Sequence, residues 1–382
     1  MAVNLSAIRA DAARLARTQR CLDHITSTGR WEHDAAEAGA LELRDELWRW
    51  SVPPSSECGW RKVDSGRART LLAGQHVVVV GDLAARLWYA ALLYLVNGTA
   101  STAEVADGYP MHKASEGSPC AWSTGGMKRG GYDFGGWAHF KKGTPCFLRW
   151  YGWRAGTLYN LTLNHTPGSK AWWGRGSTRD VMTMLLREKL LFSSWTEPVS
   201  QTTISYLWKG VIRTSGSYKS QHARHIAKVA AAVGRPPTLI VTAMGTYDSQ
   251  WQSAEQVGIR LTGLFEGLAT RWPAGSPAAP LLLNNGPSSC SGAHRYSIYM
   301  GKGTRHGTYR NLENATELVP YARRASANQS VLFVDTSRSQ MSVPPIRTSP
   351  CHYDLPLGVM AETLVQITLN ALTGPLSDPH MG

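Results

Sequence analysis

A turn in the first third of the chain has the residue types to bind an anion. Four valines follow His76, Gly81 and Asp82 end this apolar run, and apolar residues then recur at helical spacing from Leu83 to Val96. A helix that starts directly after a strand presents unpaired backbone N–H groups and the positive end of its dipole, which suit an oxyanion or a phosphate. The sequence therefore predicts a binding site at this turn, although an ordinary strand–turn–helix has the same pattern.

Three side chains near this turn or expected near it could do chemistry. Asp82 could cap the helix, because Asp accepts hydrogen bonds from the first free N–H groups, or it could take part in catalysis. Arg86 could pair with Asp82 across one helical turn or bind a substrate carboxylate. His352 precedes the last predicted helix, where it could be a general acid or base, or a surface or capping histidine.

A second candidate group follows the apolar segment TLIVTA. Gly245 lies two residues after this segment, and Tyr247 and Asp248 follow Gly245, where we expect the mouth of a cleft. Thr246 has a hydroxyl that could act as a nucleophile, but nothing in the pattern favours it over other hydroxyls. We assign Gly81, Arg86, Gly245, Tyr247 and Asp248 to substrate binding, and Asp82 and His352 to catalysis.

An alternation of strands and helices must position these residues. Short apolar runs bounded by turn residues alternate with longer amphipathic segments, which is typical of βαβ units and a parallel sheet. The central strands are expected at 76–80, 238–243, 280–285 and 331–335, and the covering helices at 84–96, 254–270 and 358–372. Further helices are expected at 5–26, 178–192, 220–233 and 314–327, and further strands at 146–151 and 157–163. The sequence predicts a three-layer α/β fold with a mostly parallel sheet.

Composition sets limits on the class of protein. The 382 residues are 43% hydrophobic, enough for a large core, and they could form two domains or one long α/β domain. No apolar segment approaches the roughly 18 residues of a membrane span. The N-terminal segment is charged and helical rather than signal-like, so we expect either an intracellular protein or one whose leader or anchor lies outside this sequence.

Glycosylation sequons and cysteines favour the secretory pathway. Six asparagines head N-x-S/T sequons, namely Asn4, Asn97, Asn160, Asn164, Asn314 and Asn328. The six cysteines are widely spaced and contain no CxxC pair, so zinc is not predicted and up to three disulfides are allowed. Six buried thiols in a cytosolic protein are the alternative. We expect the Golgi lumen or the extracellular space, and neither a cofactor nor a metal.

Charge and aromatic content indicate the partner. The net charge of +13 favours an acidic partner, and 15 tryptophans could include indoles that stack on sugar rings. No helix-turn-helix, zinc finger or RNP motif accompanies the scattered basic residues, so nucleic acid is not predicted. An acidic polysaccharide or a sulfated glycan fits both observations.

Several motifs, taken in order, resemble one known family. WRW and a cysteine in ELWRWSVPPSSECGW precede the valine strand and GDLAAR, and CHYDLPLG lies near the C-terminus. Over residues 45–373 the chain is similar to the PC-esterase group of SGNH-hydrolase-like proteins, which includes plant trichome-birefringence-like O-acetyltransferases and fungal capsule O-acetylation proteins. The resemblance implies a three-layer αβα sandwich, an acetyl donor, and acetyl transfer to or removal from cell-surface glycans by Ser-His-Asp chemistry.

The chain departs from this family at catalytic positions. Leu83 stands where the family has its nucleophilic serine, Ala243 and Thr246 replace an expected Asn and His, and Ser349 replaces the Asp three residues before His352. Without a hydroxyl at position 83, covalent acyl transfer through that residue cannot occur. Gly81, Asp82, Arg86, Gly245 and His352 are retained.

The sequence thus predicts a domain layout and leaves three functions open. Residues 1–44 are expected to form an N-terminal helical extension, 45–373 the SGNH-like domain with a Gly-rich insertion around 97–145, and 374–382 a tail. The chain could be a glycan acyltransferase or esterase, a carbohydrate-binding relative without its nucleophile, or an interaction protein unrelated to acyl chemistry. The substitutions at 83, 243 and 349 favour the second function over the first.

Overall fold

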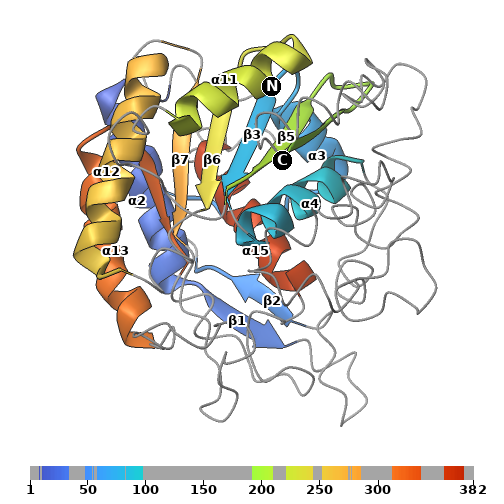
Figure 1. The fold of residues 1–382 in the computed structure, drawn as a ribbon. Coiled ribbons are helices and arrows are strands. Elements are labelled where there is room, and N and C mark those ends of the chain that lie inside the picture. Colours follow the sequence, from blue (N-terminus) through green and yellow to red (C-terminus); the bar gives the residue numbers. More distant parts are fainter. Residues whose placement is uncertain are drawn as a thin grey trace, which may run out of the picture.

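A computed structural model shows the fold of this chain (Figure 1). The structure describes residues 8, 11–33, 48–53, 55, 58–81, 83–97, 192–209, 221–243, 252–273, 276, 278–284, 312–336 and 357–373. The strands predicted at 146–151 and 157–163, residues 178–191 of a predicted helix, the insertion beyond Asn97 and the tail lie outside this part. The last residue predicted for that helix, Phe192, instead begins a strand.

A six-stranded sheet forms the centre of the molecule, in the order β4-β5-β3-β6-β7-β8. The four predicted strands are confirmed as adjacent, parallel neighbours: β3 (His76–Gly81), β6 (Leu239–Ala243), β7 (Ala279–Asn284) and β8 (Leu332–Asp335). Two strands that the sequence analysis missed extend the sheet beyond β3: β5 (Thr203–Trp208) is parallel to β3, and β4 (Phe192–Thr196) is antiparallel to β5. The chain therefore has an α/β fold with a mixed, mainly parallel sheet.

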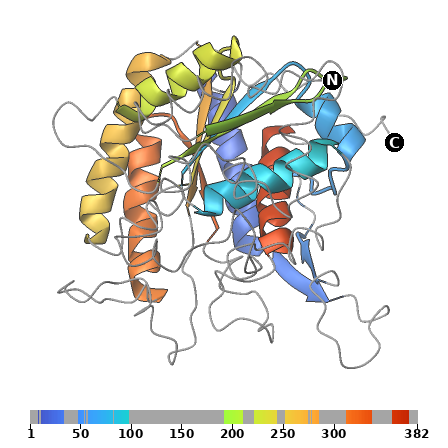
Figure 2. The ribbon, with the colours of Figure 1, turned by 45° about the vertical axis from the view of Figure 1, so that its right-hand side comes forward.

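The helices form two groups, which lie on opposite sides of the sheet in Figure 2. One group contains α2 (Ala12–Thr28), α3 (Ser65–Leu71), α4 (Leu83–Asn97) and α15 (Leu357–Thr373). The other contains α11 (Gln221–Val233), α12 (Ala254–Arg271) and α13 (Leu312–Ala327). Within the groups, α15 packs against both α4 and α2, and α12 packs against both α11 and α13.

Burial explains why the four valines form a strand. Every residue of β3 and of β6 is buried, because neighbouring strands flank both and helices cover the sheet. A strand that is buried on both faces has no polar side to present, so its sequence is a continuous apolar run rather than an alternation. This is the pattern that made the four predicted strands recognisable in the sequence.

The N-terminal helix is part of the core. Asp11 caps α2 by accepting hydrogen bonds from the N–H groups of Ala13 and Arg14, so α2 begins later than the predicted start at residue 5. The buried side of α2 packs against β8 and α15. Residues 12–28 therefore contribute to the same hydrophobic core as the sheet.

A short second sheet follows α2. β1 (Arg30–His33) and β2 (Trp48–Ser51) pair antiparallel, and neither was predicted. The Trp50 ring packs edge-on against Trp31 with 5.4 Å between ring centroids. It also lies directly over Gly29, where a Cβ atom would be only 2.3 Å from the indole. A glycine is therefore required for the chain to enter this small sheet.

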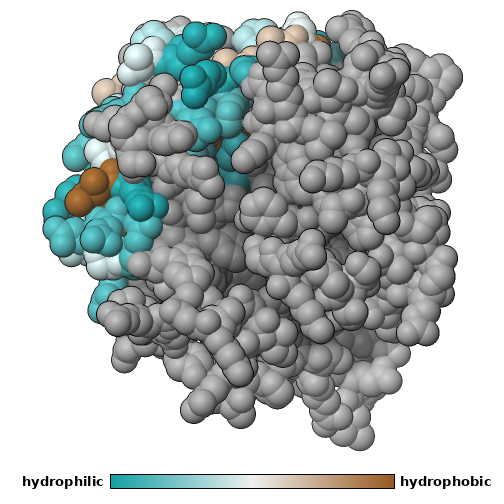
Figure 3. All heavy atoms as spheres, viewed as in Figure 1, coloured by the Kyte–Doolittle hydropathy of each residue, from teal (hydrophilic) through white to brown (hydrophobic). Residues whose placement is uncertain are grey.

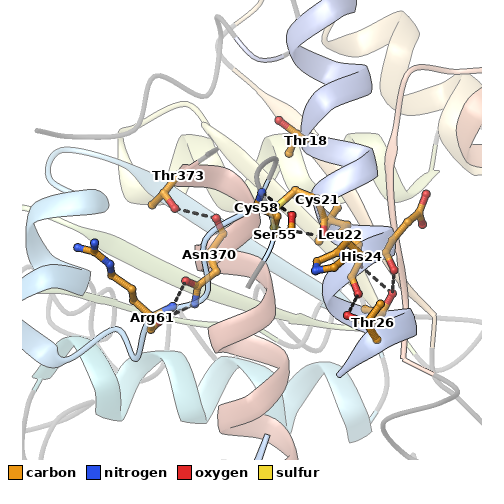
Figure 4. The surroundings of a disulfide bond; sticks show 12 residues. Thr18, Cys21, Leu22, His24, Thr26, Ser55, Cys58, Arg61, Asn370 and Thr373 are labelled. Carbon is orange, nitrogen blue, oxygen red and sulfur yellow. Dashed lines mark hydrogen bonds between the residues drawn. A yellow bond between two sulfur atoms is a disulfide. The ribbon is translucent and has the colours of Figure 1, made fainter. Parts of the chain in front are cut away.

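One disulfide and three side-chain amides join segments that are distant in sequence. Figure 4 shows the disulfide and one of the amides, that of Asn370 beside Arg61. Cys21 of α2 bonds to Cys58, with 5.2 Å between the Cα atoms. One of the allowed disulfides is thus present, and the other four cysteines lie outside the described residues. Each amide, at Gln19, Gln366 or Asn370, donates to the carbonyl and accepts from the N–H of one residue, as two strands do in a sheet. The pairs are Gln19 with Phe333, Gln366 with Val63, and Asn370 with Arg61.

The described surface is largely polar. On the face shown in Figure 3, the coloured atoms are mostly hydrophilic, and the large apolar side chains that are exposed in the described part are Val199 and Ile259. They belong to different elements, Val199 to a turn before β5 and Ile259 to α12. Within the described ranges, no helix is both long and apolar enough to cross a membrane.

Candidate functional site

The strand order places a topological switch point at the end of β3. The chain passes from β3 to β4 and β5 on one side of it, and then to β6 on the other side. In open α/β sheets, ligands bind outside the carboxyl ends of the strands at such a point, because the following connections diverge and leave a crevice. Gly81 and Ala243 are register partners at these two strand ends. The two segments that carry most of the predicted site residues therefore start side by side.

Gly81 lies too close to the backbone of β6 to carry a side chain. Its φ is +153°, and a Cβ atom here would lie 2.0 Å from the carbonyl oxygen of Ala243 and 2.8 Å from the Cβ of Ala85. No other residue fits without moving the backbone. The Gly81 carbonyl accepts hydrogen bonds from the N–H of Lys209 at 2.8 Å and from the hydroxyl of Tyr206 at 3.3 Å.

Two buried tyrosines support this turn from inside. Tyr206 of β5 and Tyr89 of α4 stack with 5.5 Å between ring centroids, and both are almost fully buried. The pair joins the helix that follows the turn to the strand beside it, and the Tyr206 hydroxyl contacts the turn itself. Sequence reasoning missed both tyrosines, because Tyr206 lies in a strand that was not predicted and Tyr89 looks like any residue of a buried helical face.

The helix after the turn begins at the position expected for a nucleophile. Leu83 is the first residue of α4, and Arg86 lies in its first turn. The backbone of α4 is described here, and the two side chains lie outside the described part. Asp82, Gly245, Tyr247, Asp248 and His352 also lie outside it. The structure thus brings together Gly81, the start of α4 and Ala243, and α15, which begins five residues after His352, packs against α4.

A histidine at the other end of β3 has a structural role. His76 is buried and its Nδ1 lies 2.9 Å from the carbonyl of Arg235, so Nδ1 carries the proton. Its Nε2 then accepts from the Ser205 hydroxyl at 2.9 Å, and Ser205 contacts the Ser194 hydroxyl at 2.8 Å. Burial lowers the pKa of His76 to about 4, against an opposing effect of the Arg235 carbonyl. The neutral ring links β3, β5 and β4 at the amino end of the sheet, away from the switch point.

A second buried histidine lies closer to the carboxyl end. His225 of α11 is 6% exposed, and its Nδ1 has no hydrogen-bond partner among the residues that the structure describes. Burial and then the positive charge of Lys209, which directly follows β5, lower its pKa to about 3, with smaller effects from Arg224 and Lys228. The ring is neutral at pH 7. The signal in the sequence that could have indicated His225 was its position on the apolar face of the helix expected at 220–233, three residues after His222, which is also buried.

Neither a metal cluster nor a relative identifies the site. In the part of the chain that the structure describes, no group of three or more His, Cys, Asp or Glu side chains could hold a metal ion. No protein-family model and no curated protein matches this chain. Its function must therefore be inferred from its own residues and geometry.

Proposed function

We propose that this chain is an SGNH-hydrolase-like protein related to the PC-esterase group, that it has lost its serine nucleophile, and that it binds cell-surface glycans. The proposal includes a three-layer αβα sandwich as the full architecture. The switch point is the main observation in support of this proposal. The Gly-Asp-Leu turn follows β3 there, at the carboxyl ends of the strands, where α/β proteins bind ligands.

The chemistry left at this turn is suited to binding rather than to covalent catalysis. The N-terminus of α4 supplies backbone N–H groups and a positive dipole end at residue 83, which favour an ester carbonyl or a carboxylate. The hydroxyl that would attack the carbonyl is absent, and removal of a nucleophile alone disables the covalent route. His352, if it meets this turn, has no proton to take from Leu83.

Charge and compartment support an acidic glycan as the ligand. A net charge of +13 attracts anionic polymers. The Cys21–Cys58 disulfide fits an oxidising compartment, where such bonds form and persist, and the six sequons fit the same compartment. A Golgi or extracellular glycan, sulfated or rich in uronic acid, is therefore the substrate class that we propose.

Restoration of the missing groups tests the proposal. The unmodified chain should hydrolyse p-nitrophenyl acetate no faster than Leu83→Ala, whereas Leu83→Ser with Ser349→Asp should gain at least about tenfold over that control, because the histidine regains a hydroxyl to activate. Binding of an acidic oligosaccharide, measured by calorimetry, should be similar in the unmodified chain and in Leu83→Ala. Strong esterase activity of the unmodified chain that is lost in His352→Ala would contradict the proposal.

A further inference from the structure

One of the six sequons lies in a place that suits covalent modification. Asn328, Gln329 and Ser330 form the turn between α13 and β8, and the Asn328 side chain is exposed. Of the sequon asparagines, it is the one whose side chain lies in the described part. From this position we propose that Asn328 is an acceptor for an N-linked oligosaccharide.

The turn holds its backbone in place and leaves the acceptor side chain at the surface. The N–H of Asn328 donates to the Arg324 carbonyl, that of Gln329 to Ser326, and that of Ser330 to Ala327. The turn is therefore formed by main-chain hydrogen bonds, and a bulky substituent on the exposed Asn328 amide displaces none of them. A sequon in a surface turn is the setting in which a glycan is compatible with a folded chain.

The modification is a group transfer with a defined donor. The side-chain nitrogen of Asn328 attacks C1 of an oligosaccharide carried on a lipid diphosphate. The bond between C1 and the diphosphate oxygen breaks, an N-glycosidic bond forms, one amide proton is lost, and the lipid diphosphate leaves. The enzyme that catalyses this transfer and its donor belong to the secretory compartment, so the inference requires entry into that compartment and does not depend on the proposed glycan-binding activity.

The location of Asn328 keeps the glycan away from the candidate site. Asn328 lies in the turn that leads into β8, which begins at Leu332, and β8 runs parallel to β7, β6 and β3 in one sheet. It therefore lies at the amino edge of the sheet, whereas Gly81 and Ala243 lie at the carboxyl edge. A glycan here would stand beside the edge strand β8 and leave the switch point open, so the modification and ligand binding are compatible.

Peptide mapping of the secreted protein tests the proposal. The full chain is expressed behind a host signal peptide in a eukaryotic cell line, and the secreted protein is treated with peptide-N-glycosidase in heavy-oxygen water. We expect the peptide that contains residue 328 to be recovered as Asp with one heavy oxygen, and Asn328→Gln to remove one step from the glycosidase-sensitive ladder on a gel.

A fold-neutral variant keeps the test clear. Ser330 has a φ of +53°, a backbone conformation that glycine adopts readily, so Ser330→Gly removes the sequon while it relaxes the turn. This variant should lose the same step with no loss of thermal stability in its deglycosylated form. Recovery of residue 328 without the heavy-oxygen label, with an unchanged ladder in Asn328→Gln and Ser330→Gly, would overturn the proposal.

Discussion

Single residues fix the geometry of the candidate site, and Gly81 does so most directly. Two glycines of this region have positive φ: Gly81, which approaches the backbone of Ala243, and Gly74, around which a Cβ atom would meet nothing within 4 Å. The two positions share a backbone preference and differ in the space around them. Their comparison therefore separates conformational strain from steric overlap.

Replacement of these glycines by alanine should have unequal effects. Gly81→Ala must displace either β6 or the start of α4, so we expect a loss of about 3 kcal/mol in the free energy of unfolding, whereas Gly74→Ala should lose about 1 kcal/mol from its backbone conformation alone. Urea unfolding followed by tryptophan fluorescence measures both. Equal losses would show that the contact between Gly81 and Ala243 does not constrain the turn.

Buried His76 should make stability depend on pH. Its pKa is about 4 in the folded chain and near 6.5 when unfolded, so between these values the unfolded state binds more protons and stability falls as the pH falls. From pH 7.5 to pH 5 this histidine should cost about 2 kcal/mol. In His76→Gln, which cannot titrate, the drop over the same range should be smaller by that amount, while His225 contributes equally to both proteins. A drop of the same size in both would contradict the assignment.

At the scale of elements, the edge of the sheet is protected by a helix side chain. β8 is the last strand of the described sheet, on the side away from β7. There, the N–H and carbonyl of Phe333 are both hydrogen-bonded to the side-chain amide of Gln19 on α2. The guanidinium of Arg323 on α13 lies 5.0 Å from the Phe333 ring centroid and forms an ion pair with Asp23 on α2. Unpaired edge strands invite pairing with other chains, so α2 protects the molecule from association as well as completing its core.

Loss of the Gln19 amide should weaken this edge. Gln19→Leu leaves the backbone groups of Phe333 without partners, and we expect a loss of about 2 kcal/mol together with faster aggregation on warming. Arg17→Leu, at an exposed position two residues earlier on α2, is the matched control and should change stability by less than about 0.5 kcal/mol. Light scattering during a thermal ramp compares them. Identical curves would mean that Gln19 does not protect β8.

The same scale shows what sequence patterns can and cannot predict. Strands β3, β6, β7 and β8 were predictable because continuous apolar runs have few alternatives in a chain rich in βαβ units. β4 and β5 were missed because their polar residues pair across the strands, Ser194 with Ser205 and Thr196 with Thr203, which a search for apolar runs does not detect. The switch point could be inferred only after β5 was placed, since the position of that strand decides where the strand order reverses.

At the scale of the whole molecule, the Cys21–Cys58 bond closes a loop across a sequence separation of 37 residues. It ties α2 to the segment that leads into α3, and that segment is in turn held by α15 through Gln366 and Asn370. Sequence alone allowed this bond among many pairings, because spacing does not determine connectivity. The folded structure selects it by bringing α2 against α15.

Removal of this disulfide should destabilise the entire domain. By the loop-entropy relation, closure of a loop of this length stabilises the folded state by about 4 kcal/mol. The double variant Cys21→Ser with Cys58→Ser should lower the free energy of unfolding by about this amount, as measured by urea unfolding. The double variant Cys21→Ser with Cys58→Ala should give the same loss, because both variants lack the bond. A double variant as stable as the unmodified chain would show that α2 is held by packing alone.

The three amide pairs predict how the chain tolerates substitution. In these long-range pairs, Gln19, Gln366 and Asn370 bond to the backbone N–H and carbonyl of Phe333, Val63 and Arg61, and any amino acid except proline supplies both groups. The three amides, in contrast, need a donor and an acceptor on one side chain of fixed length, so even Gln→Glu or Asn→Asp removes the donor. In a saturation library selected for folding, positions 19, 366 and 370 should thus be nearly invariant, while position 61 accepts most residues and positions 63 and 333 accept most apolar ones. Each contact would then join an invariant amide position to a partner position that varies freely. Such contacts would leave no correlated pairs of substitutions in related sequences.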